Sequence, residues 1–138
     1  MIGTVKILIF GHGSARSRQP LELALAKLGH ETFAEEDCAS AAACIEHHDL
    51  RVVIADGRLP KFGWVELCRQ LRSDRSKPYV HVILLEDADS THEDWAIDAG
   101  VDDFLERPAD ERELRRRLRP AAYRISATRT VRALVETA

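Results

Sequence analysis

Asp56 is the residue best placed to take part in chemistry, because it ends a short apolar run and precedes a glycine. The preceding residues, Val52 to Ala55, are apolar at every position, which is typical of a strand covered on both faces of a parallel sheet. In an open parallel sheet, ligands and reactions gather outside the carboxyl ends of the strands. The sequence therefore places Asp56 for function, with the alternative that its carboxylate only starts the turn at Gly57.

A second candidate is the glycine-rich segment Gly11 to Arg16, which follows another apolar run. A glycine-rich turn between a strand and a helix can direct backbone N–H groups at an anion, and Ser14 and Arg16 would add donors. The segment lacks the full spacing of a dinucleotide site or a P-loop, so a loop without a ligand is the favoured interpretation. His12 is the side-chain type of a general base, but no known motif pairs it with a Ser or Cys nucleophile.

Length and composition indicate one soluble globular domain. The chain has 138 residues, 45% hydrophobic and 31% charged, and its net charge of -3 gives no general attraction to nucleic acid or anionic membranes. The apolar runs are too short for a membrane span or a signal peptide, so we expect a cytoplasmic protein. The cysteines are odd in number and lack paired metal-ligand spacing, which predicts reduced thiols. They are Cys38, Cys44 and Cys68.

The elements that must position these residues alternate between strand and helix. Apolar runs predict strands at Val5–Phe10, Thr32–Ala34, Val52–Asp56, Val80–Leu85 and Val101–Leu105. Periodicity and capping residues predict helices from about Ser17–Pro20 to Gly29, from Asp37 or Ser40 to His48, over Trp64–Ser73, over Ser90–Ala99 and from Asp110 through Leu118. Five such units with short links imply a parallel sheet between two layers of helices.

The chain continues beyond Leu118, where Pro120 is expected to break or restart the helix. We therefore predict a domain over residues 1–119 and a C-terminal helical extension over residues 120–138. Apolar or small residues in the extension recur at roughly heptad spacing, which indicates either a short coiled-coil seam or an amphipathic tail packed on its own domain. They are Ala121, Ile125, Thr128 and Val135.

The strongest motif begins at Asp56 and reads DGRLPKFG, with a proline and a glycine at fixed offsets from the aspartate. It resembles the phosphoacceptor segment of response-regulator receiver domains, and Val82 to Leu85 and Gly100 to Pro108 resemble the fourth and fifth strands of that family. The resemblance implies a flavodoxin-like doubly wound α/β fold, with five parallel strands in the order 2-1-3-4-5 and five helices. It further implies Asp56 as the phosphoacceptor, Phe104 as the aromatic switch residue and a cis peptide bond before Pro108.

Four positions depart from the pattern of that family. Gly11 and His12 stand where the family has two acidic residues that hold Mg²⁺ with the phosphoacceptor. Glu86 replaces the Thr or Ser whose hydroxyl contacts the phosphoryl group, and Arg107 replaces a lysine. Mg²⁺ prefers several oxygen ligands that include carboxylates, so a bound Mg²⁺ is disfavoured and no other cofactor is implied. Because phosphoryl transfer depends on charge neutralisation, we expect phosphorylation of Asp56 to be slow or absent.

The same substitutions indicate what holds the site instead. The guanidinium of Arg107 can grip a carboxylate at two points, unlike a lysine, and Glu86 reaches further than a threonine. We expect Arg107 to pair with Glu86, with Asp56 or with both, and His12 to donate a hydrogen bond to Asp56. An ion-pair network would then occupy the space of metal and phosphate. The alternative is that Arg107 alone satisfies Asp56 while Glu86 points into solvent.

Charge is distributed unevenly along the second half of the chain, where an acidic fourth helix and fifth strand precede a basic fifth helix. Such a surface can meet its own copy across a two-fold axis, so we expect a homodimer through the face of the fourth and fifth helices. The alternative is that these charges pair within one chain or are solvated. The basic fifth helix belongs to no known nucleic-acid-binding motif, so it does not predict nucleic-acid binding. The acidic residues are Asp89, Glu93, Asp94, Asp98, Asp102 and Asp103, and the basic residues are Arg112, Arg115, Arg116, Arg117 and Arg119.

The sequence as a whole predicts a receiver-like module that acts by binding rather than as an enzyme, with a histidine kinase or another signalling protein as its partner. The main alternative is a genuine phosphoacceptor response regulator, phosphorylated on Asp56 by a histidine kinase. A third hypothesis is an anion or nucleotide sensor at Gly11 to Arg16.

Overall fold

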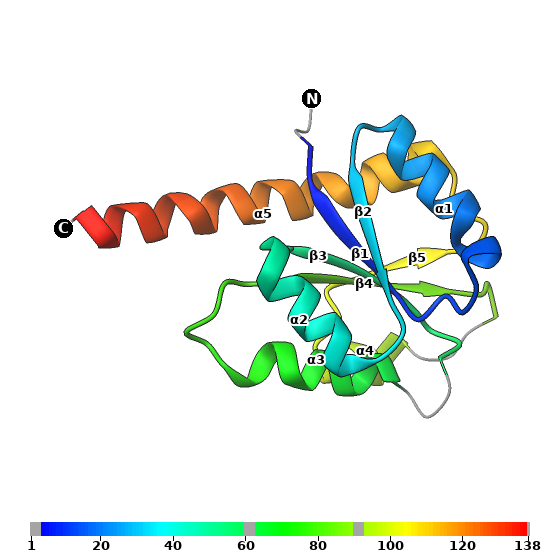
Figure 1. Cartoon of the computed structure of the whole chain (residues 1–138), viewed down its shortest axis with the longest axis horizontal. Helices are drawn as coiled ribbons and strands as arrows, with labels where there is room; N and C mark the ends of the chain where they lie inside the picture. Colours follow the sequence, from blue (N-terminus) through cyan, green and yellow to red (C-terminus); the bar gives the residue numbers. More distant parts are fainter. Residues whose placement is uncertain (1–3, 60–62, 90–92, 138) are drawn as a thin grey trace.

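Five apolar runs form the strands of the structure, and the segments between them form helices on both faces of the sheet (Figure 1). The strands are β1 (Lys6–Phe10), β2 (Glu31–Glu35), β3 (Val52–Asp56), β4 (His81–Glu86) and β5 (Asp103–Glu106). The helices are α1 (Ala15–Lys27), α2 (Cys38–His48), α3 (Gly63–Ser73), α4 (Glu93–Ala99) and α5 (Glu111–Thr137). The computed structural model describes residues 4–59, 63–89 and 93–137, without the side chains of residue 93 and residues 126–137.

The strands form one parallel sheet in the order β2-β1-β3-β4-β5, which confirms the predicted flavodoxin-like topology. The central strands β3 and β4 are buried at every residue, because helices cover both of their faces. The register places Phe10 beside Ala55 and Asp56 beside Leu85. The carboxyl ends of β1, β3 and β4 therefore lie together at one edge of the sheet.

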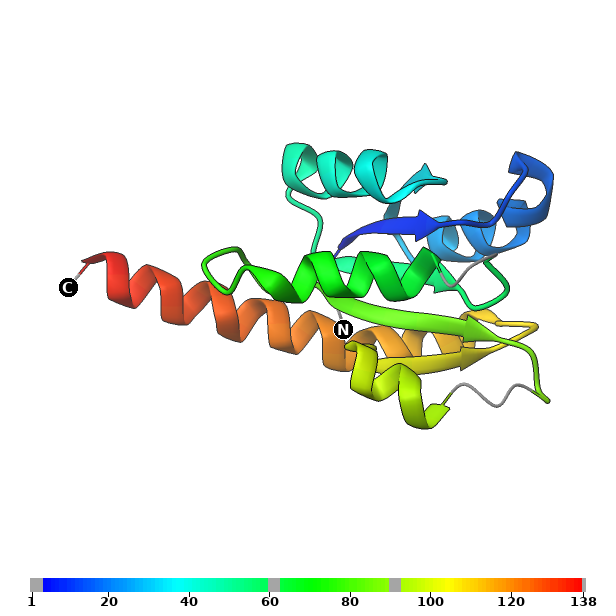
Figure 2. The same cartoon turned by 90° about the horizontal axis from the view of Figure 1, so that it is seen from below.

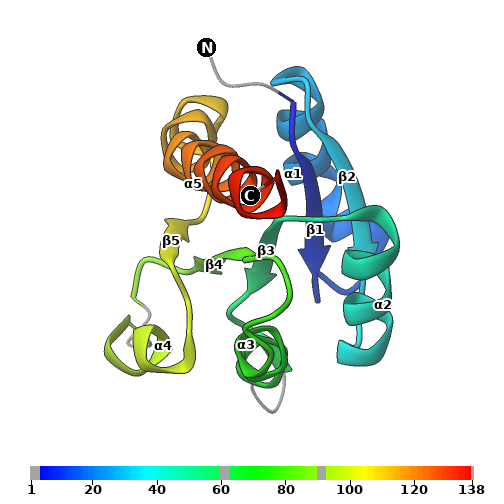
Figure 3. The ribbon, with the colours of Figure 1, turned by 90° about the vertical axis from the view of Figure 1, so that its left-hand side faces the viewer.

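Two apolar cores hold the helices on the sheet, one on each face. Figure 3 shows the sheet between α1 and α5 on one side and α2, α3 and α4 on the other. Leu25 of α1 and Leu118 of α5 are fully buried in the first core. In the second core Trp64 of α3 is fully buried, and its ring stacks on Trp95 of α4 with centroids 5.2 Å apart. Burial of such large side chains is the main stabilising contribution to this fold.

The first helix begins earlier than predicted, at Ala15 rather than near Ser17 to Pro20. Ser14 is its N-cap, and the Ser14 hydroxyl accepts a hydrogen bond from the Ser17 backbone N–H at 3.2 Å. An N-cap of this type satisfies a donor that the first turn leaves without a partner. This capping determines the start of α1, and Pro20 is accommodated inside the helix on its exposed side.

The predicted helix break at Pro120 is wrong, because α5 runs through this residue to Thr137. Pro120 is exposed, so the carbonyl that loses its hydrogen bond can be solvated. Ala121 and Ile125 are buried beyond the proline, in the same core as Leu118, and this packing continues the helix. Figures 1 and 2 show the C-terminal part of α5 projecting away from the domain. The predicted seam positions Thr128 and Val135 lie outside the described side chains.

Two further expectations concern helix capping and membranes. The Asp110 side chain caps α5 by accepting from the Glu113 backbone N–H at 2.8 Å, whereas the cap predicted at Ser90 lies outside the described residues.

Over the described part of the chain, no helix is both long enough and apolar enough to cross a membrane.

Candidate functional site

Asp56 lies at the carboxyl end of β3, and only 3% of its surface is exposed. The strand places it there because the apolar residues before it are locked between two helical layers. Glu86 ends the neighbouring strand β4 and is also buried. The structure therefore brings two carboxylates to the edge of the sheet where the sequence predicted chemistry.

Two arginines hold the Asp56 carboxylate. Arg58 donates from its backbone N–H to Oδ1 at 2.9 Å, from Nε to Oδ1 at 3.3 Å and from Nη2 to Oδ2 at 3.1 Å. Arg107, which follows β5, donates from Nη2 to Oδ1 of the same carboxylate. Both carboxylate oxygens are therefore acceptors in charge-assisted hydrogen bonds, which are among the stronger contacts available to a carboxylate.

These contacts determine the ionisation of the site. Burial raises the pKa of Asp56, but hydrogen bonds from Arg58 and Arg107 outweigh it, so the pKa lies below its ordinary value. Burial lowers the pKa of His12, the charge of Asp56 opposes that shift, and Arg107, Arg58 and Arg18 reinforce it. At neutral pH the site therefore contains an ionised Asp56 and a neutral His12.

Arg107 also connects the site to its rim. Its Nη1 lies 3.2 Å from Oδ1 of Asp87, and its backbone N–H donates to the Glu86 carbonyl at 2.8 Å. The predicted pair between Arg107 and Asp56 is confirmed, and the second carboxylate that its side chain binds is Asp87.

Glu86 does not point into solvent, so that alternative is wrong. Its side chain folds over the turn that follows Asp56, where a Cβ on Gly57 would lie 2.9 Å from Glu86 Oε1. The Gly57 N–H donates to the Leu85 carbonyl at 2.8 Å, and this bond fixes the turn against β4. A second carboxyl group therefore lies beside the turn that follows Asp56.

Gly11 and His12, the positions where the family resemblance implies an acidic pair, are filled in different ways. Gly11 has a φ of +80°, and a Cβ there would lie 2.3 Å from Cδ2 of Leu59, so the Leu59 side chain covers it. His12 is 7% exposed, and neither of its ring nitrogens has a hydrogen-bond partner among the described residues. The predicted hydrogen bond from His12 to Asp56 is therefore wrong, because arginine donors occupy the Asp56 oxygens instead.

The residues present do not fit Mg²⁺. This ion requires near-octahedral coordination by oxygen and is usually held by one or two carboxylates besides phosphate. Here both Asp56 oxygens accept from guanidinium groups, and Gly11 and His12 supply no carboxylate. In the described ranges, no group of three or more His, Cys, Asp or Glu residues could hold a metal ion.

The other predicted site features lie around this edge. Phe104 is half-buried and packs against the core beneath α4. The Arg107–Pro108 peptide bond is cis, as the resemblance implied. Pro60, the proline of the motif that resembles a phosphoacceptor segment, lies outside the described residues. In the loop from Gly11 to Arg16, the Gly13 N–H already donates to Glu36 Oε2 at 3.2 Å, so a side chain of the protein occupies part of the proposed anion site.

The charged face of α4 and α5 is partly neutralised within the chain. Asp102 pairs with Arg124, and Asp103 pairs with Arg117. Besides Arg124, four arginines of α5 are exposed among the described side chains, and α4 carries two exposed aspartates. These residues are Arg112, Arg115, Arg116 and Arg119, and Asp94 and Asp98.

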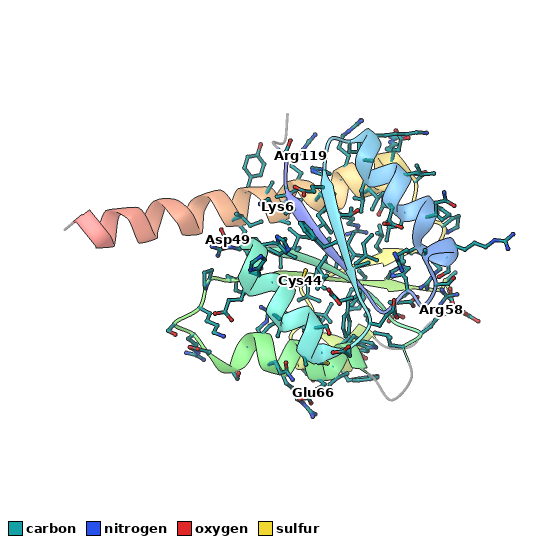
Figure 4. The ribbon with its side chains drawn as sticks, viewed as in Figure 1. Lys6, Cys44, Asp49, Arg58, Glu66 and Arg119 are labelled. Atoms are coloured by element: carbon teal, nitrogen blue, oxygen red, sulfur yellow. The ribbon has the colours of Figure 1, made fainter. Side chains whose placement is uncertain are left out.

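Sequence reasoning missed three residues of the site, namely Arg58, Leu59 and Asp87. Arg58 is half-exposed at the loop beyond β3, at the end of the molecule opposite Asp49 (Figure 4). The sequence pattern that could have indicated Arg58 is an arginine two residues after an aspartate in a turn. At this spacing both the backbone N–H and the side chain of the arginine can reach the carboxylate of the aspartate. The contact of Leu59 with Gly11 depends on two loops meeting in space and leaves no local pattern.

Comparison with known proteins places these observations in a family. The family model described as response regulator receiver domain matches residues 14–119. The response regulator MprA of Mycobacterium sp. (strain KMS) is 32% identical over 123 residues, which cover 88% of this chain and 52% of the relative. The phosphate regulon transcriptional regulatory protein PhoB of Pseudomonas aeruginosa is 26% identical over 125 residues, which cover 90% of this chain and 54% of PhoB. The chain thus spans about half the length of these curated relatives.

Solved structures show the same fold. The chemotaxis response regulator CheY4 of Vibrio cholerae matches with a TM-score of 0.70 at 20% identity, over 86% of this chain and 99% of CheY4. The response regulator receiver domain from Bermanella marisrubri matches with a TM-score of 0.73 at 19% identity, over 86% of this chain and 98% of that one. The arrangement of strands and helices described above is therefore that of the solved neighbours.

Proposed function

The chain belongs to the response regulator receiver domain family, and from this premise we propose that it is a receiver-like signalling module acting mainly through protein–protein interaction. In this proposal, Mg²⁺-dependent phosphorylation of Asp56 is slow or absent, and the module is not an enzyme. The observation that carries the proposal is the Asp56 carboxylate, since Arg58 binds both of its oxygens and Arg107 binds Oδ1.

The chemistry of phosphoryl transfer supports this proposal. A carboxylate nucleophile must present a free lone pair to phosphorus, and the transferring oxygens need nearby positive charge that does not block attack. The Asp56 lone pairs point at guanidinium groups, and buried Glu86 adds negative charge at the adjacent turn. With no acidic pair to bind Mg²⁺, the strongest source of charge neutralisation is also missing.

The test is intact-mass spectrometry after incubation with acetyl phosphate and Mg²⁺, with Asp56→Asn as the control. We expect no phosphoryl mass increment on the wild-type chain, while circular dichroism shows that both proteins are folded. A prompt increment that Asp56→Asn abolishes would contradict the proposal. It would support the alternative that Asp56 is a genuine phosphoacceptor for a histidine kinase.

That alternative has a specific observation in its favour, because Arg58 is 56% exposed and is therefore the donor that most easily leaves Asp56. Arg58→Ala separates the two obstacles to phosphorylation. If Arg58→Ala shows the phosphoryl mass increment and the wild type does not, the contact of Arg58 with Asp56 is the obstacle to phosphorylation. If neither gains it, Arg58 is not the deciding obstacle, and the remaining ones are the Arg107 contact, Glu86 and the absence of carboxylates at Gly11 and His12.

We also propose a homodimer through the face of α4 and α5, with a histidine kinase or another cytoplasmic signalling protein as the partner. The exposed aspartates of α4 and the exposed arginines of α5 are complementary across a two-fold axis. Light scattering tests the dimer, since Asp98→Lys or Arg115→Glu alone should weaken it and the two together should restore it. A monomer at all accessible concentrations contradicts this part of the proposal.

We further propose that residues 120–138 form a helical extension of a receiver-like domain at residues 1–119. Because Ala121 and Ile125 are buried, truncation after Arg119 should lower the melting temperature without abolishing folding. A truncated chain that does not fold would show that the extension is part of the domain.

A further inference from the structure

Two neighbouring aspartates at the start of β5 each bind an arginine of α5. Arg124 Nη1 donates to Asp102 Oδ1 at 3.0 Å, and Arg117 Nη1 donates to Asp103 Oδ1 at 3.1 Å. The two arginines are about two helical turns apart, and Pro120 lies between them. The ion pairs therefore hold α5 on both sides of its proline.

Asp102 is the centre of a larger cluster that fixes it in place. Its Oδ2 accepts from Arg72 Nη2 and from the Val82 N–H, each at 2.8 Å, and its Oδ1 also accepts from the Tyr79 hydroxyl. Arg72 in turn donates to the Gly100 carbonyl at 2.9 Å. The carboxylate is thus immobilised by α3, β4 and the loop before β4, and it presents a fixed anchor to α5.

Besides its ion pair with Asp102, Arg124 also contacts Tyr79. Its Nη1 lies 3.0 Å from the Tyr79 hydroxyl, and its guanidinium carbon lies 4.9 Å from the centroid of the Tyr79 ring. The Arg72 guanidinium carbon lies 4.5 Å from the centroid of the same ring. The Tyr79 ring therefore contacts both guanidinium groups, and for Arg124 the ion pair with Asp102 and the contact with the ring act together.

A support of this kind is needed at this point of α5. A proline inside a helix removes one backbone hydrogen bond and crowds the preceding turn, at a cost of about 3 kcal/mol. Helices with an interior proline usually bend or break there. The apolar contacts of Leu118 before the proline and Ile125 after it bind α5 to the sheet, but non-directional contacts fix its orientation less strictly than ion pairs with defined geometry.

We propose that Asp102 and Asp103 form a splint, a pair of anchors at the start of β5 that holds α5 straight across Pro120, with Asp102 binding Arg124 and Asp103 binding Arg117. The splint ties the direction of the projecting helix to β5. The same strand leads at its other end to Arg107, which binds Asp56. The inference does not depend on whether Asp56 is phosphorylated, because it rests on contacts at the opposite end of the sheet.

The test is residue-resolved amide hydrogen exchange of residues 121–125 by NMR on the full chain. Arg124→Gln should accelerate exchange at these amides about tenfold, because the anchor beyond the proline is lost and this part of the helix opens locally. The matched control is Tyr123→Gln, which replaces a side chain of the same helix that is 68% exposed and precedes Arg124 in the sequence. The control should leave the exchange rates within about twofold of the wild type.

A second comparison separates the splint from an ordinary surface contact. In a Pro120→Ala background the helix no longer has a weak point, so Arg124→Gln should change the exchange rates less than about twofold. Tyr79→Phe keeps the ring and removes the hydroxyl, and should give an intermediate acceleration. The proposal is overturned if Arg124→Gln leaves exchange unchanged, or if its effect is as large without Pro120 as with it.

Discussion

Replacing Gly11 by alanine should destabilise the protein by about 2–3 kcal/mol, more than the same change at Gly13. Both glycines have positive φ, +80° and +74°, which costs an alanine about 1 kcal/mol. At Gly13 the nearest atom to a new Cβ is Ser17 Oγ at 3.9 Å, so little is added. At Gly11 a new Cβ would lie 2.3 to 2.5 Å from three atoms of the Leu59 side chain. Moving Leu59 away from its packed position adds about 1–2 kcal/mol.

Urea unfolding followed by tryptophan fluorescence measures these differences, because the fully buried Trp64 reports on the core. The decisive variant is Leu59→Ala, which removes the obstructing side chain. In that background the penalty of Gly11→Ala should fall to that of Gly13→Ala, about 1 kcal/mol. Equal penalties at Gly11 and Gly13 in the wild type, or an unchanged penalty at Gly11 in the Leu59→Ala background, would refute the steric argument.

Three further outcomes are expected. Arg107→Ala should lower the free energy of unfolding by about 1–2 kcal/mol and raise the pKa of Asp56, which an NMR titration of its carboxyl carbon measures; an unchanged pKa contradicts the described ion pair. Burial lowers the pKa of His12, His30 and His81, so below about pH 6.5 the unfolded chain binds more protons than the folded one. Stability should therefore be full above about pH 7.5 and decline as the pH falls through about 6.5, whereas a flat profile in urea unfolding excludes neutral buried histidines. Burial raises the pKa of Cys68 to about 11, so a thiol reagent should modify Cys68 only after unfolding, while rapid labelling of the native protein would show that the thiol is accessible.

The position of the site could be predicted from the sequence because it follows from one local pattern. A run that is apolar at every residue and ends in Asp56 must be a covered strand, and covered parallel strands present their carboxyl ends to solvent. The pairing of Arg107 with Asp56 could also be predicted, since a guanidinium fork and a carboxylate at the same edge of a sheet attract each other strongly. These inferences need only strand order and side-chain chemistry.

The details that could not be predicted depend on competition between groups. His12 and the two arginines are all donors near Asp56, and the arginines occupy its oxygens, because a permanently charged donor binds a carboxylate more strongly than a neutral imidazole does. Glu86 was expected either to pair with Arg107 or to face solvent, yet its side chain lies over Gly57. The geometry of that turn is set by the hydrogen bond from the Gly57 N–H to the Leu85 carbonyl. No sequence pattern predicts this hydrogen bond.

Helix boundaries show the same limit. Two prolines, Pro20 and Pro120, were expected to begin or to interrupt helices, but both lie inside helices. In α1 the hydrogen bond at Ser14 fixes the start, and in α5 the buried Ala121 and Ile125 carry the helix onward. A local preference against proline was outweighed by capping in one case and by tertiary packing in the other.

The length of α5 magnifies small changes in its orientation. From Pro120 to Thr137 the helix extends for about 25 Å, at about 1.5 Å per residue. A tilt of only about 10° at Pro120 would move its far end sideways by about 4 Å, close to the separation of neighbouring β-strands. A group attached to that end would move by this amount after a rotation too small to disturb the sheet. The projecting part of α5 therefore converts sub-ångström rearrangements near the domain into displacements as large as a side chain.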